Sequence, residues 1–309
     1  MNCNLCGSKN FKKDYWKIGN LGYTKCNKCG LIFQCPMFTQ EELSEIYKNY
    51  FIFKRESQGL EYGYRNYEHE RSVNNFKKHY LSWLNKYITE KDSFLDFGCG
   101  TGNLIKLMRE QGHKAEGCEF SEEAIAILVK KQIPFWQYKD IDKIKKKYRY
   151  ISIIDVIEHL ESPSEDLKKI ASLLEDNGLL FIETVNSDDF FVKYIYKNNW
   201  QGIGPPHLYL WGEKTLTKLL KKFGFKIIEI KKYKMSGSLI SRIIQNLLYY
   251  PINIALIFIK KKETFLGYKT EKLKHFIGNH KKSHYQFSFG DGIRIVAQKY
   301  GNFNNHSNL

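Results

Sequence analysis

Short apolar runs alternate with amphipathic segments through the central part of the chain, residues 91–235. Phe94–Phe97, Tyr150–Ile154 and Leu179–Ile182 are apolar runs of strand length. The segment Asn103–Glu110 has the spacing of a helix with one buried face. Strands that alternate with helices in this way are typical of βαβ units around a parallel sheet. The pattern therefore predicts an α/β domain with helices on both faces of a mostly parallel sheet.

Capping residues mark the ends of several predicted elements. Ser121 precedes two glutamates, which complement the positive end of a helix dipole, and so it predicts a helix start. The segment Ser162–Glu165 combines a capping box with proline at the first helical position, and Asn177 followed by glycine is a left-handed stop. We therefore expect a helix from residue 163 to Asn177, with the next strand beginning at Leu179.

Three further regions flank the α/β part. Residues 1–36 hold two close pairs of cysteines and show little helical periodicity. Residues 37–90 are rich in tyrosine and place apolar residues three and four apart, which predicts a helical segment. Residues 236–309 combine an apolar helical stretch with a late strand, Ile293–Gln298. We therefore expect a small N-terminal unit, a helical linker or cap, the α/β domain, and a C-terminal helical insertion with a final strand.

The net charge of +16 on 309 residues would favour nucleic acid or a membrane surface as a partner. Nearly all the positive charge comes from lysines spread along the chain, so a solvated surface is the simpler interpretation. The longest apolar stretch, residues 239–262, contains Arg242, Pro251 and Asn253, which argue against a membrane-spanning helix. Peripheral membrane contact through this stretch, or a role in covering the active site, stays open.

Four of the seven cysteines form two Cys-x-x-Cys pairs, and each pair is followed by glycine. No apolar signal segment opens the chain, so we expect metal binding in a reducing, cytoplasmic compartment rather than a disulfide framework. Two thiolates two residues apart reach one tetrahedral site, and two such pairs complete a shell with no open position. The sequence therefore predicts a zinc ribbon with a structural zinc ion. Its predicted ligands are Cys3, Cys6, Cys26 and Cys29.

The strongest cofactor signal is a glycine-rich run that follows a strand and precedes a helix. Its glycines are Gly98, Gly100 and Gly102. They let the backbone turn sharply and leave room for a ligand against the main chain. The dinucleotide fingerprint needs a further glycine where this chain has Asn103, so NAD fits poorly. Glu119 ends the second predicted strand, where a carboxylate accepts hydrogen bonds from ribose hydroxyls. S-adenosylmethionine has a ribose and an adenine but no pyrophosphate, and it satisfies both observations.

These residues resemble the motifs of the class I S-adenosylmethionine-dependent methyltransferases. Phe94–Gly102 is similar to their first motif, and Glu119-Phe120 to their ribose and adenine contact. Asp155–Leu160 resembles the fourth-strand motif of the subgroup that includes ubiquinone-type O-methyltransferases. The resemblance implies a Rossmann-like seven-stranded sheet whose last strand pair is antiparallel. It also implies a set of cofactor-binding residues: Asp96, Gly98, Cys99, Gly100, Gly102, Glu119, Phe120, Asp140, Ile141 and Asp155.

A zinc ribbon in front of such a domain resembles bacterial methyltransferases that act on sugars attached to nucleotides. In that group a segment rich in tyrosine and histidine follows the fifth strand and supplies a base; here it corresponds to residues 204–211. The resemblance implies a nucleotide-linked sugar or surface-glycan precursor as the acceptor. The His-Glu-His run of the sugar C-methyltransferases is reduced to His207, which weakens C-methylation and leaves O-methylation open.

Two histidines are candidates for the general base. A hydroxyl nucleophile must lose its proton, and a histidine near its ordinary pKa suits that task. His207 follows the predicted fifth strand, at the carboxyl edge of the sheet where ligands bind in such folds. His159 follows the fourth strand, and either takes part in chemistry or orders the loop. Tyr62, Tyr64 and Tyr67 lie in the predicted helical segment. The corresponding region of related enzymes folds over cofactor and substrate.

Two other classes of function compete with a small-molecule methyltransferase. A nucleic-acid methyltransferase would use the ribbon and the basic surface to hold RNA, but amino-type base methylases usually carry an Asn/Asp-Pro-Pro-Tyr/Phe signature where this chain has Asp155–Glu158. A non-catalytic binding module would need neither the intact glycine loop nor Glu119. The favoured hypothesis is methyl transfer from S-adenosylmethionine to a small molecule.

Overall fold

The computed structural model of the chain describes residues 1–18, 21–39, 41–46, 54–55, 60–61, 77, 79–189, 192–193, 207–233 and 292–300. The tyrosines at 62, 64 and 67, residues 204–206 and the apolar stretch 239–262 lie outside the described residues. Within the described part, no helix has the length and apolar character that crossing a bilayer requires.

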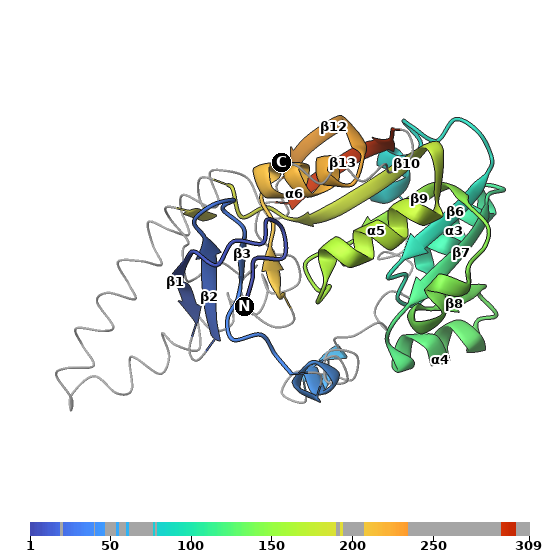
Figure 1. The fold of residues 1–309 in the computed structure, drawn as a ribbon. Helices are drawn as coiled ribbons and strands as arrows, with labels where there is room; N and C mark the ends of the chain where they lie inside the picture. Colours follow the sequence, from blue (N-terminus) through green and yellow to red (C-terminus); the bar gives the residue numbers. More distant parts are fainter. Residues whose placement is uncertain are drawn as a thin grey trace, which may run out of the picture.

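The central feature is a seven-stranded sheet with the order β12-β13-β10-β9-β6-β7-β8 (Figure 1). Its strands are β6 (Ser93–Phe97), β7 (Lys114–Glu119), β8 (Phe135–Gln137), β9 (Tyr148–Ile154), β10 (Leu174–Val185), β12 (Phe225–Tyr233) and β13 (Gly292–Lys299). The strands from β8 to β10 pair in parallel, while β13 is antiparallel to both β10 and β12. The predicted Rossmann-like sheet with its antiparallel last pair is therefore confirmed.

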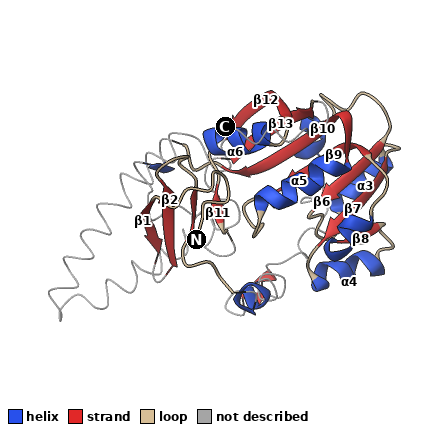
Figure 2. Cartoon of the chain, in the orientation of Figure 1, coloured by secondary structure: helices blue, strands red, loops and turns tan. Residues whose placement is uncertain are grey.

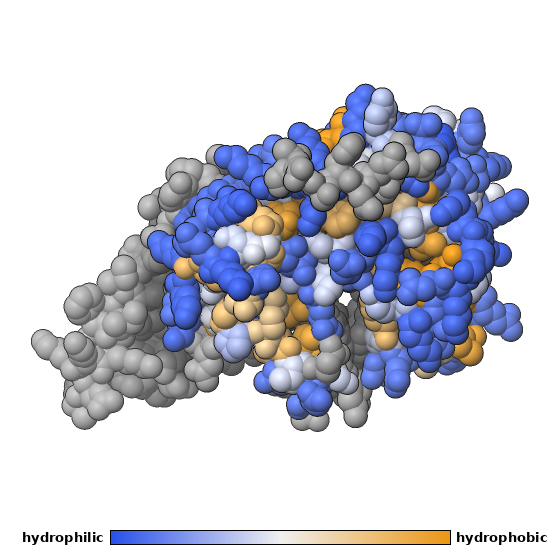
Figure 3. Space-filling view, viewed as in Figure 1, coloured by the Kyte–Doolittle hydropathy of each residue, from blue (hydrophilic) through white to orange (hydrophobic). Residues whose placement is uncertain are grey.

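Helices cover both faces of this sheet because successive strand residues point to opposite sides. The helices are α3 (Asn103–Glu110), α4 (Glu122–Lys130), the 3₁₀ helix η2 (Tyr138–Lys143), α5 (Pro163–Leu173) and α6 (Glu213–Lys222), together with helical residues 41–46 and 79–84. One face packs Phe94, Tyr150 and Phe181 against α3 and residues 80–84. The other face packs the alternate strand residues against α5, α6 and the N-terminal segment. Figure 1 shows α5 in front of the sheet, and Figure 3 shows that mostly hydrophilic residues cover this face of the molecule.

The N-terminal segment forms a second sheet with the order β1-β2-β3-β11 (Figure 2). Its strands are β1 (Phe11–Ile18), β2 (Leu21–Cys26), β3 (Ile32–Gln34) and β11 (Tyr209–Leu210), and all neighbours pair antiparallel. A separate two-stranded pair joins β4 (Lys54–Arg55) to β5 (Leu60–Glu61). The sequence did not predict that a strand from residues 207–211 would complete the N-terminal sheet.

Two local predictions around α5 were wrong, and tertiary contacts explain both. The helix ends at Leu173 rather than Asn177, because Leu174 already pairs with Tyr148 of β9. Asn177 does have a left-handed φ of 61°, but it lies in an irregularity of β10 before pairing resumes at Leu179. At the other end of the helix, Ser162 makes no capping hydrogen bond through its side chain.

Asn4 of the N-terminal segment supplies the cap that Ser162 does not. Its Oδ1 accepts a hydrogen bond from the backbone N–H of Ser164 (3.1 Å), and its carbonyl accepts one from the Ser164 hydroxyl (2.7 Å). A side-chain oxygen that accepts from a first-turn N–H stabilises a helix start, whichever part of the chain supplies it. The N-terminal segment is therefore attached to the α/β part at the beginning of α5.

Candidate active site and metal site

The loop between β6 and α3 has the backbone shape that its glycines predict. Gly98 and Gly102 both have a positive φ, 76° and 80°. A Cβ added at Gly98 would come within 2.3 Å of the Val156 side chain, and one at Gly102 within 2.6 Å of Ile133. Neither position tolerates a larger residue, since both the conformation and the available space favour glycine. The loop therefore presents bare backbone at the carboxyl end of β6.

The Glu119 carboxylate lies directly against this loop. One oxygen accepts from the backbone N–H of Gly100 (2.6 Å), and the other accepts from those of Phe120 (2.7 Å) and Ser121 (2.9 Å). The side chain is buried, and burial raises its pKa although the three amide donors oppose this. Each carboxylate oxygen has two lone pairs, so Glu119 retains acceptor capacity beyond these contacts.

Asp96 lies on β6 beneath the same loop. The Ser152 hydroxyl donates to its Oδ1 over 2.6 Å. Burial and the charge of Glu119 together raise the pKa of Asp96 to about 7, even though the bond from Ser152 lowers it. Cys99 contributes backbone to the loop, while its thiol is buried and would collide with any side chain at Gly117.

An aromatic wall adjoins Glu119. Phe120, which is 40% exposed, stacks on Tyr138 with ring centroids 4.3 Å apart, and Phe97 meets both rings edge-on. Asp140 is paired with Lys143 at 2.6 Å. The Ile141 side chain is buried in the core. The sequence did not predict that Tyr138 would stack on Phe120.

The loop after β9 brings the two candidate bases together. The rings of His159 and His207 lie 4.8 Å apart at 61°. Side-chain atoms of Glu158, His159 and His207 all lie within 4.8 Å of one another. Glu158 is buried and accepts a hydrogen bond from the Thr184 hydroxyl (2.8 Å). Asp155 begins the same loop, is exposed, and donates its backbone N–H to the carbonyl of Glu183 (2.9 Å).

The contact between Glu158 and His207 was not predicted from the sequence. The buried Glu158 carboxylate lies beside the His207 ring. Burial raises the pKa of Glu158, and the closeness of His207 opposes that rise. The two residues are 49 positions apart in the sequence, and nothing in their local patterns marks them as neighbours.

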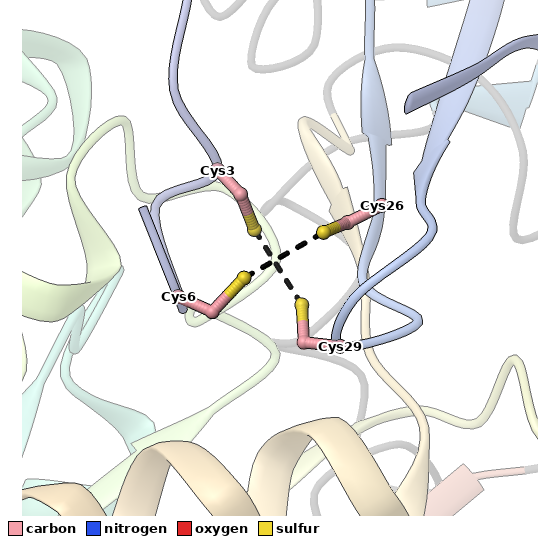
Figure 4. Close-up of side chains that lie close together, drawn as sticks. All are labelled: Cys3, Cys6, Cys26 and Cys29. Atoms are coloured by element: carbon pink, nitrogen blue, oxygen red, sulfur yellow. Dashed lines mark hydrogen bonds between the residues drawn. The ribbon is translucent and has the colours of Figure 1, made fainter. Parts of the chain in front are cut away.

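The four predicted metal ligands converge on one point (Figure 4). Cys3 and Cys29 have sulfur atoms 3.5 Å apart, those of Cys6 and Cys26 are 3.6 Å apart, and all four lie within 4.8 Å of one another. In a regular tetrahedron with bonds of about 2.3 Å, thiolates lie roughly 3.8 Å apart. The hydrogen bond between Cys3 and Cys29 lowers the pKa of Cys3 to about 5 and raises that of Cys29, so it favours one thiolate in this pair. The donor set therefore fits a tetrahedral zinc ion.

A strand, a glycine loop and a helix, followed by a carboxylate at the end of the next strand, define a Rossmann-like cofactor-binding protein. Residues 64–230 match the family model described as Methyltransferase domain, which is more than half of the chain. The chain belongs to this family of class I methyltransferase domains.

Curated relatives match about a third of the chain. The ubiquinone biosynthesis O-methyltransferase of Coxiella burnetii is 29% identical over 125 residues, which are 38% of this chain and 53% of that protein. The protein of the same description from Pelagibacter ubique is 32% identical over 99 residues, 30% of this chain and 41% of that one. The chain thus spans about half the length of the curated relatives it matches.

Solved structures of similar fold include a SAM-dependent methyltransferase from Archaeoglobus fulgidus, with 19% identity and a TM-score of 0.47, covering 77% of this chain and all of that one. Magnesium protoporphyrin IX methyltransferase from Synechocystis, with bound SAH, has 16% identity and a TM-score of 0.44, covering 75% and 83%.

Proposed function

We propose that this protein transfers a methyl group from S-adenosylmethionine to a hydroxyl group of a small molecule. The observation that carries the proposal is the juxtaposition of the bare glycine loop, the Glu119 carboxylate and the Phe120–Tyr138 stack. When bound, the cofactor supplies an activated methyl group on a sulfonium.

Each part of this site has a role in holding the cofactor. Gly98, Gly100 and Gly102 all have a positive φ, so the loop turns sharply and offers backbone groups, rather than Cβ atoms, to the cofactor. Glu119 accepts hydrogen bonds from the ribose hydroxyls, and Phe120 with Tyr138 offers a flat surface to the adenine. Asp96 lies near the end of β6, Asp140 and Ile141 lie on η2 directly after β8, and Asp155 directly follows β9. Positioning of the two reactants then supplies much of the rate.

His207 is the proposed general base, and His159 is the alternative. His207 is 8% exposed and lies next to a buried carboxylate, Glu158, which favours a fixed ring orientation. His159 is partly buried and closer to the cofactor loop in sequence. A base is needed because a neutral hydroxyl is a poor nucleophile until it loses its proton.

The proposed acceptor is a nucleotide-linked sugar or glycan precursor. Support comes from the metal ribbon in front of the methyltransferase domain and from the single histidine in the segment after β10. The curated relatives are O-methyltransferases of ubiquinone biosynthesis, so a phenolic hydroxyl is the competing small-molecule acceptor.

Isotope transfer tests the proposal. The full chain is incubated with methyl-labelled S-adenosylmethionine and separate panels of nucleotide sugars, phenols and RNA, and the products are analysed by mass spectrometry. Label in a nucleotide sugar supports the whole proposal, and label in a phenol supports the reaction but rejects the acceptor. Label in RNA alone, or in none of the panels, overturns the proposal.

Glu119→Ala is expected to weaken S-adenosylmethionine binding at least tenfold in calorimetry. Charge-assisted hydrogen bonds to the ribose are lost, and three loop amides lose their acceptor. Glu122→Ala is the matched control, because this exposed glutamate lies on the first turn of α4 and makes no contact with the loop amides. Equal affinity in both variants would reject Glu119 as a ribose ligand.

We also propose one structural zinc ion per chain, held by the four clustered cysteines. Elemental analysis of protein purified without chelator should find about one equivalent of zinc. Cys26→Ser should lose it, whereas Cys35→Ser should keep it because Cys35 lies outside the cluster. Metal-free wild-type protein, or equal zinc content in the two variants, would remove the ion from the proposal.

A further inference from the structure

The segment that carries His207 belongs to two parts of the molecule at once. It follows the fifth strand of the methyltransferase sheet in the chain, but β11 is the fourth strand of the N-terminal sheet (Figure 2). Tyr209 pairs with Phe33 and Leu210 with Ile32. His207 therefore lies two residues before β11, the strand that completes the N-terminal sheet.

Strands β1, β2 and β3 with the four cysteines are called the ribbon here. Two polar groups of the ribbon hydrogen-bond to the backbone at the candidate base and at the residue after it. The hydroxyl of Tyr23 on β2 donates to the carbonyl oxygen of His207 over 2.7 Å. The N–H of Gln34 on β3 donates to the carbonyl of Leu208 over 2.8 Å. Tyr23 is fully buried among Ile32 and Leu210, so its hydroxyl has a fixed direction.

The opposite edge of the same segment holds the loop after β9. The N–H groups of Leu208 and Tyr209 both donate to the carbonyl of Glu158, over 2.8 and 3.0 Å. Trp211 donates its indole N–H to the carbonyl of Ile157 (3.1 Å). The ribbon therefore positions His207 directly and, through the same short segment, reaches the loop that carries Glu158 and His159.

The cysteine cluster lies close to this contact in the chain. Cys26 is the last residue of β2, and its N–H donates to the carbonyl of Leu31, immediately before β3 begins at Ile32. A metal ion that joins Cys26 and Cys29 to the first cysteine pair would fix the turn between β2 and β3. It would thereby fix the strand edge on which β11 lies.

We infer that the ribbon is a positioning element of the active site, that Tyr23 is its main positioning residue, and that metal in the cysteine cluster keeps the base-bearing segment in place. The inference rests on the proposed role of His207. A buried carbonyl that loses its donor carries a free-energy cost, which the segment relieves by moving. The position of the His207 side chain in the active site then depends on the ribbon.

Tyr23→Phe is the direct test, since it removes one oxygen and keeps the ring. We expect kcat to fall about tenfold, as a displaced base would give, with unchanged affinity for S-adenosylmethionine. Hydrogen exchange of the 207–211 segment should become faster, while that of β6 should not. Tyr15→Phe is the matched control, because the hydroxyl of this tyrosine accepts a hydrogen bond from Lys25 (3.5 Å), whereas that of Tyr23 donates to the carbonyl of His207. Wild-type kcat together with wild-type exchange in Tyr23→Phe would overturn the inference.

Metal removal tests the same coupling without relying on turnover. After treatment with a chelator, the full chain should lose hydrogen-exchange protection over residues 207–211 by at least tenfold, while β6 and β7 keep theirs. Protection that persists at 207–211 in metal-free protein would overturn the role of the metal. If the wild type transfers no methyl group to any acceptor, the proposed function fails, and the exchange data still decide whether the ribbon holds this segment.

Discussion

His207→Ala should lower kcat by roughly 10²-fold or more and leave S-adenosylmethionine affinity unchanged, because a general base acts only as the nucleophile loses its proton. The side chain is 8% exposed and held beside Glu158, so its removal leaves no nearby histidine except His159 in the described part of the site. Steady-state kinetics at saturating cofactor, together with calorimetry on the same preparation, separate the two quantities.

His159→Ala provides the comparison, since its ring lies 4.8 Å from that of His207. If His159 only orders the loop after β9, its variant should bind S-adenosylmethionine more weakly and keep more of its turnover at saturation. The reverse pattern, with His159 essential and His207 dispensable, transfers the role of base to the fourth strand. Full activity in both variants would mean that the acceptor is an amine that is already deprotonated, or that a tyrosine is the base.

Glu183→Ala should destabilise the fold by about 3–5 kcal/mol, the range for removing one partner of a buried ion pair. Glu183 and Arg294 face each other on β10 and β13, and their side chains are 1% and 8% exposed. The hydroxyl of Tyr80 also donates to Glu183 (3.1 Å). Burial alone raises the pKa of Glu183, but the hydrogen bond from His79 and the charge of Arg294 outweigh it, so the pKa lies below its ordinary value. The pair is therefore ionised near neutral pH.

Urea unfolding measures this effect, and an exposed pair provides the control. Without Glu183, the Arg294 guanidinium stays buried among the rings of Trp83 and Tyr233, with its centre 4.7 and 4.8 Å from their centroids. Glu110→Ala breaks the Lys77–Glu110 pair, whose side chains are 41% and 46% exposed, and surface pairs contribute about 0–1 kcal/mol. The double variant Glu183→Leu/Arg294→Met should recover much of the loss, since it leaves no buried charge. Similar stability in Glu183→Ala and Glu110→Ala would contradict the prediction.

Much of the α/β fold could be predicted because its signals are local. The alternation of strand-length and helix-length apolar patterns gave the layered sheet, and the segment Asn103–Glu110 forms α3 with the expected bounds. The glycine loop was also predictable, since a positive φ at Gly98 and Gly102 can be inferred from residue type and position. The cysteine spacing likewise predicted that the four side chains would converge on one point, as they do.

Predictions were wrong where residues distant in the sequence supply the hydrogen bonds that a local residue was expected to make. Ser162 and Pro163 correctly marked the start of α5, yet the N–H of Ser164 is capped by Asn4, 160 residues away. Asn177 has the predicted left-handed conformation, but it does not end a helix. It lies within β10, which begins at Leu174 because that residue pairs with β9. Propensity decides what a segment favours in isolation, and the extra hydrogen bonds of a tertiary contact outweigh that preference.

The sequence by itself determined the class of fold, the glycine loop and the clustering of four cysteines, because each depends on residues close together in the chain. Only the tertiary structure decided how the ribbon relates to the active site. Tyr23 and His207 are 184 residues apart, and the two residues of β11 are too few to carry a periodic pattern of their own. The residues of β11 pair with the edge of β3. The unpaired backbone groups of a strand edge can pair with any segment that packing brings beside them. That choice is made by the packing of the whole chain.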